Sequence, residues 1–331
     1  MTLQPLLREP VAAGHRIEHI EYAGRPAIVL RSEADDLEAV LLPAVGLVVA
    51  SLRHRGDELL GRTDELDAYV SDGAPMGVPL LHPWANRLNG DVYTAAGRRV
   101  RLPAGSPLVR RDEHGLPIHG LLTASPHWTV TRVEAGHDAA RLAATLDFGA
   151  RAELLAAFPF PHRITVEARL AGPALVIRTA VVPTGRRVVP VAFGFHPYLR
   201  LPGVPRADWR IGLPAARHLA LDARGIPTGA WTPAPAEYGR LGARTFDDGY
   251  AGLGPGATYT LAGGGRRIAV RLERGYPAAQ LFAPAAEDVV CFEPMTAPAN
   301  ALRSGGGLRW APPGGAYSAT FTIGVADERE P

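Results

Sequence analysis

The stretch His162-Arg163-Ile164-Thr165-Val166-Glu167-Ala168-Arg169-Leu170 decides the fold class of this chain. After His162, its even-numbered positions are apolar and its odd-numbered positions are polar. A period of two is typical of an antiparallel strand that buries one face and leaves the other face in water. The same alternation recurs at residues 142–148, 268–272 and 317–325. The sequence therefore predicts an extensive antiparallel sheet structure.

Helices have little place in this pattern. The chain contains 37 glycines and 31 prolines, which long helices would not tolerate. Only residues 64–70 and 150–158 are suited to short helices, whereas the apolar segments 17–31 and 38–53 are interrupted by Gly and Pro and indicate hairpins. We therefore expect an all-β fold, a large antiparallel sandwich with few short helices.

The domain organisation is expected to be simple. We find no internal repeat and no break in composition, so we expect one domain over residues 1–331. The Pro- and Gly-rich residues 225–242 are expected to form a long surface loop, because alternating strands resume after them.

The overall composition excludes several classes of protein. The 331 residues are 47% hydrophobic with a formal net charge of +2, and the arginines are scattered among acidic residues, so we expect no nucleic-acid partner. No apolar run approaches the roughly 18 residues of a membrane span and no early segment resembles a signal peptide, so we expect a cytoplasmic protein without a membrane partner. All 35 basic residues are arginine, which excludes Schiff-base chemistry on a lysine amine. The single cysteine, Cys291, lies in an apolar run and is expected to be a small buried residue.

Residues 188–201, Val-Val-Pro-Val-Ala-Phe-Gly-Phe-His-Pro-Tyr-Leu-Arg-Leu, hold the first candidate functional residue. Their β-branched first half predicts a strand near an edge or a bend. His196 ends this strand, and the proline after it keeps His196 extended. With Phe193, Phe195 and Tyr198 around it, the imidazole either faces a pocket or merely fills the end of the strand.

Three other segments hold polar side chains suited to binding hydroxyl groups. Asn86 and Arg87 follow an apolar run, and an amide with a planar guanidinium can hold vicinal hydroxyls, although Asn86 could instead cap a turn. His119 lies between apolar residues, where a satisfied, half-buried histidine is the alternative. Asp247 belongs to an Asp-Asp-Gly sequence, which is most often a turn.

Glu293 completes a candidate acid/base pair with His196. Like His196, it ends an apolar strand and precedes a proline. A carboxylate at a buried strand end loses hydration, which raises its pKa and suits it to act as a general base. His82, His119, His196 and Glu293 could together bind a metal, but none has the short paired spacing of metal ligands, so we expect no metal.

These residues give the chain a family resemblance. From about Gly24 to Val325 it is similar to the aldose 1-epimerases, the family of galactose mutarotase. The motifs that carry the resemblance occur in the family's order, and they are Pro83-Trp84-Ala85-Asn86-Arg87-Leu88 with Gly90 and Tyr93, His119-Gly120, His196-Pro197-Tyr198, Asp247 with Tyr250, and Glu293 with Asn300.

The resemblance implies a galactose mutarotase-like β-supersandwich with an open groove and no cofactor. It implies an isomerase that interconverts the α and β anomers of a free aldohexose. His196 would be the general acid at the ring oxygen and Glu293 the general base at the C1 hydroxyl. The sugar hydroxyls would be held by Asn86, Arg87, His119 and Asp247.

The sequence leaves the substrate and the assembly open. A phosphosugar 1-epimerase, the first alternative, would need a basic cluster at the groove, for which the candidates are Arg98, Arg99 and Arg101. The second alternative, a non-catalytic carbohydrate-binding protein, would not need both an acid and a base. The expected partner is a small-molecule sugar, bound by a monomer or a homodimer.

Two details of the site also remain to be decided. Trp84 would either stack on a sugar face or lie in the core. Burial would lower the pKa of His196 and the charge of Glu293 would raise it, and we expect the charge to prevail.

Overall fold

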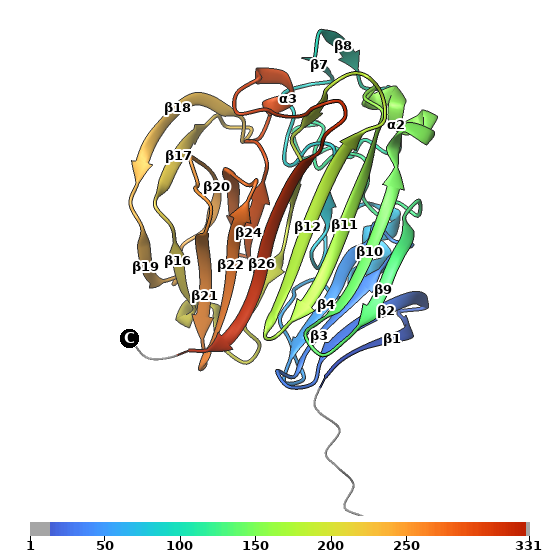
Figure 1. Cartoon of the computed structure of the whole chain (residues 1–331). Coiled ribbons are helices and arrows are strands. Elements are labelled where there is room, and N and C mark those ends of the chain that lie inside the picture. The colour runs from blue at the N-terminus through green and yellow to red at the C-terminus, as the bar shows by residue number, and fades with distance from the viewer. Residues whose placement is uncertain (1–13, 329–331) are drawn as a thin grey trace, which may run out of the picture.

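A nine-stranded antiparallel sheet extends across the computed structural model, which describes residues 14–328 (Figure 1). Its strands, in spatial order, are β19 (Glu237–Arg240), β16 (Arg210–Leu213), β21 (Ala257–Gly263), β22 (Arg266–Arg274), β26 (Tyr317–Asp327), β12 (Ala174–Pro183), β11 (His162–Ala171), β10 (Ala140–Asp147) and β9 (Thr129–Ala135). In β11 every second residue from His162 to Leu170 is buried, as the alternation predicts. The long sheet therefore has one apolar face that other layers must cover.

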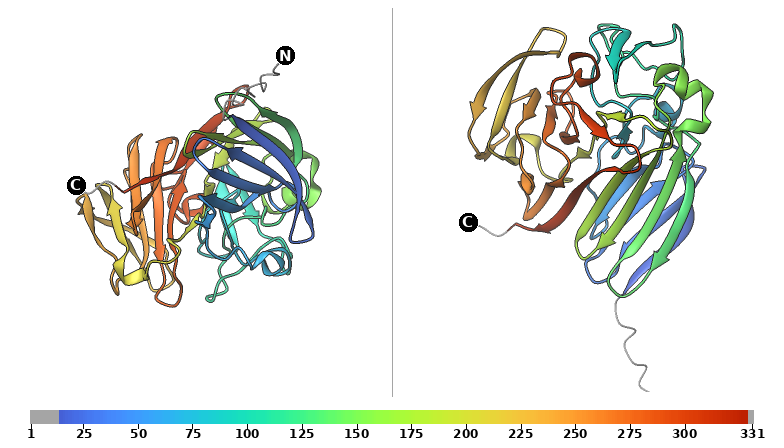
Figure 2. Two further views of the ribbon diagram at one scale, coloured as in Figure 1. Left: turned by 90° about the horizontal axis from the view of Figure 1, so that it is seen from below. Right: turned by 45° about the horizontal axis from the view of Figure 1, so that its top comes forward.

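A five-stranded sheet covers the β9–β11 end of this face (Figures 1 and 2). Its strands are β1 (His15–Tyr22), β2 (Arg25–Ser32), β3 (Leu37–Leu42), β4 (Val48–His54) and β5 (Asp57–Glu58). β1 and β2 form the predicted hairpin at residues 17–31, and β3 and β4 form the one at 38–53.

An eight-stranded sheet packs against the other end of the nine-stranded sheet. Its strands, in spatial order, are β18 (Pro227–Ala234), β17 (Ala216–Leu221), β20 (Phe246–Ala251), β23 (Ala278–Ala283), β24 (Val290–Met295), β14 (Gly194–Phe195) and β6 (Leu80–Leu81), with β15 (Tyr198–Leu199) also paired to β24. Aromatic pairs join it to the nine-stranded sheet: the rings of Phe292 and Tyr259 stack with centroids 5.2 Å apart, and those of Phe195 and Phe321 are 5.0 Å apart. This face of β14 and β24 therefore lies in the core.

The remaining elements are short. They are the pairs β13 (Val189–Val191) with β25 (Arg309–Ala311) and β7 (Val92–Ala95) with β8 (Arg98–Arg101), the α-helices α1 (Leu66–Ser71), α2 (Ala152–Ala157) and α3 (Ala301–Ser304), and 3-10 turns at Phe148–Ala150 and Arg206–Asp208. The predicted all-β supersandwich with few short helices is thus confirmed, and α1 and α2 lie in the segments predicted for them. Among the described residues, the helices are all too short or too polar to cross a membrane.

Residues 225–242 correct one prediction. They contain β18 and β19 instead of a long surface loop. Both are edge strands, β18 of the eight-stranded sheet and β19 of the nine-stranded sheet. At an edge, a proline removes no hydrogen bond from the ladder if its missing N–H would have faced outward, so Pro- and Gly-rich sequence can still form a strand.

The segment 188–201 is only partly as predicted. It forms three very short strands, β13, β14 and β15, rather than one. Phe193 and Phe195 do not surround His196, because both pack in the core, Phe193 against the ring of Tyr276 and Phe195 against Phe321. Tyr198 does contact His196.

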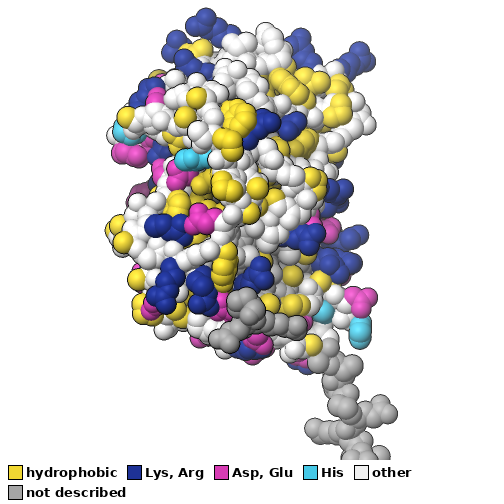
Figure 3. Space-filling model, turned by 90° about the vertical axis from the view of Figure 1, so that its left-hand side faces the viewer, with side chains coloured by type: hydrophobic (Ala, Val, Ile, Leu, Met, Phe, Trp, Pro, Cys, Tyr) yellow, Lys and Arg dark blue, Asp and Glu magenta, His cyan; other side chains and the backbone are white. Residues whose placement is uncertain are grey.

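The surface on the side of β18 and β19 carries charges of both signs. Arginines, acidic side chains and apolar side chains lie interspersed over this face (Figure 3). The exposed Trp231 of β18 is covered in part by the guanidinium of Arg217, which lies 4.6 Å from the ring centroid.

The close approach of β14 to β24 gives a first prediction. A Cβ added to Gly194 would lie 2.6 Å from the carbonyl oxygen of Pro294 and 2.9 Å from Cβ of Ala85. We expect Gly194→Ala to destabilise the protein by about 1–3 kcal/mol, because the strands would have to move apart. Thermal unfolding followed by circular dichroism measures this as a lower Tm.

Gly239 is a matched control, since it also lies in a strand, β19, and a Cβ there would meet no atom within 4 Å. Gly239→Ala should leave the Tm almost unchanged. If the two variants unfold at the same temperature, the contact between β14 and β24 is not tight.

Candidate active site

A groove of about 350 Å³ opens on the face of the eight-stranded sheet that lies opposite the aromatic pairs. Strands of this sheet form its floor, and loops within residues 62–119 form its wall. Its lining is mostly polar and consists of Arg62, Pro75, Asn86, Arg87, Arg110, Asp112, Glu113, Ile118, His119, His196, Tyr198, Asp247, Phe282 and Glu293. All six residues predicted for the site are in this set.

His196 and Glu293 face each other at the floor of the groove. Gly194 pairs with Met295 and Tyr198 pairs with Cys291, so the register between them puts His196 opposite Glu293. The imidazole Nε2 lies 3.2 Å from Oε1 of the carboxyl, and the two residues are 5% and 2% exposed. The side chains next to them in sequence, Phe195 and Phe292, point to the opposite face, as strand alternation requires.

Aromatic side chains fix the imidazole of His196. The Tyr198 ring stacks on it with centroids 4.3 Å apart and planes 11° apart, and the Tyr198 hydroxyl lies 3.4 Å from Nε2. The rings of Phe282 and His119 form T-shaped contacts with it, with centroids 5.9 Å and 5.5 Å away. Because the ring is held on several sides, its Nε2 keeps one direction toward Glu293.

Charged side chains surround Arg87 at the Glu293 end of the groove. Its Nε lies 2.6 Å from Oδ2 of Asp112, and its other nitrogens lie 3.3 Å from Glu113 and 3.6 Å from Asp247. Gln280 of β23 donates to Oδ1 of Asp247 at 2.7 Å. The guanidinium and the carboxylate of Asp247 are therefore oriented by neighbours and still line the groove.

Several wall residues adopt backbone conformations that are uncommon for side chains with a Cβ. Asn86, His119 and Arg62 have φ values of 57°, 63° and 57°. The N–H of His119 donates to the carbonyl of Asn86 at 3.1 Å, which joins the two wall loops. Asn300, also at positive φ, donates its N–H to the carbonyl of Arg87 at 2.8 Å. Such clustering of less favourable conformations is common at functional sites.

Burial controls the protonation of the acid/base pair. It lowers the pKa of His196 to about 3, with the charges of Arg62 and Arg110 acting in the same direction. It also raises the pKa of Glu293 well above its ordinary value, and nearby Asp247 adds to the effect. The expectation that the Glu293 charge would hold the pKa of His196 high is thus wrong, because so little of either group remains in contact with water. His119 is also kept neutral, since burial lowers its pKa well below the ordinary value.

Two residues of the motif around Asn86 lie outside the groove. Trp84 is 1% exposed and belongs to the core, which decides between the two interpretations of its role. His82 is buried beneath the wall, where its Nε2 lies 2.8 Å from Nε2 of His162. His82 therefore cannot share a ligand with His196. Among residues 14–328, no group of three or more His, Cys, Asp or Glu side chains is arranged to hold a metal ion.

Sequence reasoning missed two cations of the groove, Arg62 and Arg110. Both come from irregular segments without hydrophobic periodicity. Arg62, which has a positive φ, follows Gly61 in the sequence. No signal in the sequence indicates that its side chain lies in the groove. Cys291, in contrast, is fully buried as predicted.

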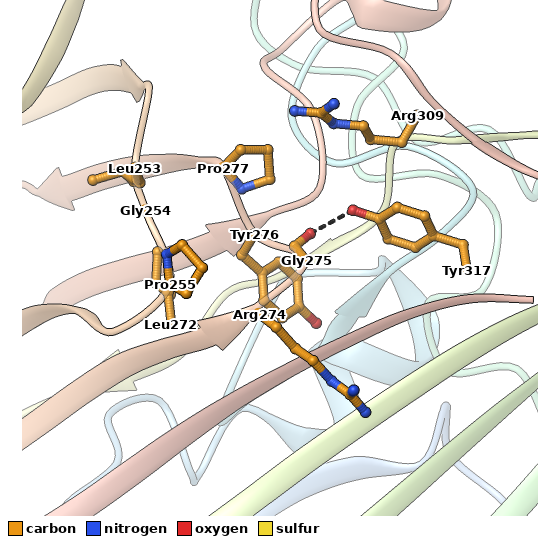
Figure 4. Close-up of a pocket in the computed structure, with 10 residues that line it drawn as sticks. All are labelled: Leu253, Gly254, Pro255, Leu272, Arg274, Gly275, Tyr276, Pro277, Arg309 and Tyr317. Carbon is orange, nitrogen blue, oxygen red and sulfur yellow. Dashed lines mark hydrogen bonds between the residues drawn. The ribbon is translucent and has the colours of Figure 1, made fainter.

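A second hollow, of about 230 Å³, lies between the ends of β22 and β26 and the segment before β23 (Figure 4). The Tyr317 hydroxyl donates to the carbonyl of Gly275 at 2.7 Å within it. Its two arginines, Arg274 and Arg309, point in different directions, and its lining contains neither a carboxylate nor a histidine. It therefore lacks the groups for proton transfer that the groove has.

Solved structures share this architecture. A protein of Synechocystis sp. PCC 6803 is 24% identical with a TM-score of 0.75, and the match covers 97% of this chain and 100% of that one. A galactose mutarotase-like protein of Clostridium acetobutylicum is 17% identical with a TM-score of 0.79, covering 95% and 99% of the two chains. Galactose 1-epimerase of Lactobacillus acidophilus NCFM is 15% identical with a TM-score of 0.76, covering 95% and 100%. The fold is thus that of galactose mutarotase-like proteins.

The sequence itself carries the family assignment. A family model described as aldose 1-epimerase matches residues 29–324. The chain therefore belongs to the aldose 1-epimerase family, as the motifs predicted. None of the curated proteins searched matches the sequence.

The raised pKa of Glu293 makes stability depend on pH. In the unfolded chain this carboxyl ionises near its ordinary pKa of 4.5, whereas in the folded protein it stays protonated to higher pH. The unfolding free energy should therefore fall as the pH rises from 4.5 through the raised pKa, by on the order of 1 kcal/mol for each pH unit between these two values. Glu293→Gln removes this loss, so the variant should gain Tm relative to wild type as the pH rises above 5.

Glu21 of β1, an exposed carboxylate that forms no ion pair with any described residue, serves as the control. Glu21→Gln should follow the wild-type Tm at every pH. A difference between wild type and Glu293→Gln that stays constant with pH would show that the folded protein keeps Glu293 ionised.

Proposed function

We propose that the protein is a mutarotase, an aldose 1-epimerase that interconverts the α and β anomers of an aldohexose. The observation that carries the proposal is the distance of 3.2 Å between Nε2 of His196 and Oε1 of Glu293. Ring opening acts on O1 and on the ring oxygen O5, which are both bonded to C1. A base and an acid that act on two such neighbouring atoms must themselves be close together.

The reaction needs only proton transfers. The Glu293 carboxylate takes the proton of the O1 hydroxyl, O1 forms a double bond to C1, and the C1–O5 bond breaks. The electron pair of that bond goes to O5, which receives the proton of the His196 imidazolium. After the aldehyde rotates about the C1–C2 bond, the same transfers run in reverse and close the ring on the other face. Each positioned group contributes roughly 10²- to 10⁴-fold to the rate.

Burial favours one step of this cycle. Opening the ring converts ionised Glu293 and protonated His196 into the two neutral groups. Because burial raises the pKa of Glu293 and lowers that of His196, it stabilises the pair in the state that accompanies the open-chain sugar. Glu293 Oε2, buried and without a hydrogen-bond partner among the described residues, is free to accept from O1.

The polar wall would hold the sugar. We assign the binding of its hydroxyls to Asn86, Arg87, His119 and Asp247. Arg87 and Asp247 lie beside Glu293, so they suit the hydroxyls next to C1. The neutral imidazole of His119 can donate one hydrogen bond and accept one.

Replacement of the pair tests the mechanism. Glu293→Gln and His196→Asn should each lower kcat/KM for anomer exchange at least ~100-fold, since each removes one proton transfer. Two-dimensional exchange NMR between the anomers of glucose and of galactose measures the rate. His218→Asn is the control, because His218 bonds Asp248 outside the groove and its loss should leave the rate unchanged. A folded Glu293→Gln or His196→Asn protein with more than about a tenth of wild-type activity would remove that residue from the mechanism.

The pH profile tests the protonation state of the pair. Activity requires one proton on the pair as a whole, in either of its two arrangements. The acid limb of kcat/KM therefore reports the addition of a second proton, which the pKa of about 3 at His196 moves far below neutrality. We expect kcat/KM, corrected for the uncatalysed rate, to change less than about threefold between pH 7 and pH 5. A fall with a midpoint near 6.5 would mean that His196 titrates as an ordinary imidazole.

A further inference from the structure

The groove is electrically uneven along its length. At the Glu293 end, the single cation Arg87 faces three carboxylates, those of Asp112, Glu113 and Asp247. At the His196 end the lining holds two cations, Arg62 and Arg110, and no carboxylate. The charges that act on Glu293 are those of Asp247 and Arg87, whereas those that act on His196 are Arg62 and Arg110. The two catalytic groups therefore separate an acidic end from a basic end.

Arg62 is held firmly at the basic end. Its Nε and Nη2 bond the Glu287 carboxylate at 2.7 Å and 2.5 Å, and its guanidinium carbon lies 4.6 Å from the centroid of the Tyr198 ring. Its Nη1 also donates to the Tyr198 hydroxyl at 3.3 Å. Arg62 is thereby joined to the ring that stacks on His196, and its own charge is matched by Glu287.

Arg110 is the cation that this arrangement leaves without a counter-ion. It is half-buried, and its hydrogen-bond partner within residues 14–328 is the backbone carbonyl of Gly73, at 2.6 Å from Nη1. None of the described carboxylates forms an ion pair with it, and the neighbouring charge of Arg62 repels it. A partly desolvated guanidinium with donors left over favours an anion that would approach through the groove.

The direction of the sugar decides which of its atoms reaches Arg110. With Glu293 at O1 and His196 at O5, the hydroxyls next to C1 extend toward Arg87 and Asp247. The ring atom on the other side of O5 is C5, and its substituent C6 continues beyond His196. In this orientation C6 points to the basic end of the groove.

We propose that Arg110, supported by Arg62, binds an anionic group on C6, so that the substrate is an aldose with a carboxylate or a phosphate at that position. This assignment rests on the proposed mutarotase function, because the orientation of the sugar follows from the roles of His196 and Glu293. It makes Arg110 a specificity-determining residue. The Arg98, Arg99 and Arg101 cluster is not required, since none of the three lines the groove.

The hairpin arginines lie in different surroundings. Arg99 and Arg101 line a separate hollow with Arg303 that shares no lining residue with the groove. Arg98 donates to the carbonyl of Pro159 at 2.6 Å and lines neither this hollow nor the groove. Arg101, an exposed arginine, is therefore the matched control for Arg110.

The experiment compares four sugars by exchange NMR: glucose, galactose, glucuronate and glucose 6-phosphate. With wild-type protein, kcat/KM for glucuronate or for glucose 6-phosphate should exceed that for glucose at least ~10-fold, since a charge-assisted contact to a guanidinium is worth that much. The better of the two identifies the anion as a carboxylate or a phosphate. Arg110→Gln should reduce the ratio of the anionic sugar to glucose at least ~10-fold, Arg110→Lys should reduce it less, and Arg101→Gln should not change it.

The outcomes separate this inference from the proposed function. Equal or better turnover of the neutral sugars, or an unchanged ratio in Arg110→Gln, would overturn the anion site and leave the mutarotase intact. A loss of preference in Arg101→Gln instead would assign the anion to the hairpin and overturn the role of Arg110. If wild-type protein accelerates the exchange of none of the four sugars, the mutarotase function itself fails. A calorimetric titration of Glu293→Gln with the preferred anionic sugar, with and without Arg110→Gln, gives a binding readout that does not depend on turnover.

Discussion

The pairing register between the segment around His196 and β24 is the constraint on which the site depends. Neighbouring residues of a strand point to opposite faces, so Phe195 and Phe292 in the core fix His196 and Glu293 in the groove. A slip by one residue would exchange the two faces, burying His196 and Glu293 in the core and exposing the aromatic rings. The apolar pairs that hold the sheets together therefore also hold His196 and Glu293 in position.

Desolvation then decides how this pair behaves. In water, the charge of a carboxylate would favour a protonated imidazole beside it. In the groove, the loss of hydration outweighs that attraction and favours the neutral forms of both groups. The pair still holds one proton in all, which is the number that the proposed ring opening and closure require. The surrounding charges are kept at the two ends of the groove, where Arg87 and Arg62 have carboxylate partners of their own.

The sequence predicts these features unequally. The alternation at 162–170 predicts the antiparallel sheets, and Glu293 and His196, each before a proline, indicate the acid/base pair. Glu293 does not end its strand as predicted, however, because β24 continues through Pro294 to Met295. Arg62 and Arg110 could not be found in this way, because loop residues have no periodicity and only the folded chain brings them beside Tyr198. The error at 225–242 comes from composition. Pro and Gly indicate turns, but an edge strand needs only one row of hydrogen bonds and therefore tolerates them.

The edge position of β18 has a consequence for the behaviour of the protein in a crowded solution. An unpaired strand edge offers its free N–H and C=O groups to any extended segment of another chain, and such additions lead to aggregates. Pro227 and Pro233 deprive this strand of two N–H groups, and Gly229 at a φ of 94° interrupts its extended backbone. A passing strand would therefore find too few donors to pair with. The Pro- and Gly-rich composition that indicates a loop therefore also keeps strands of other chains from pairing with this edge of the sheet.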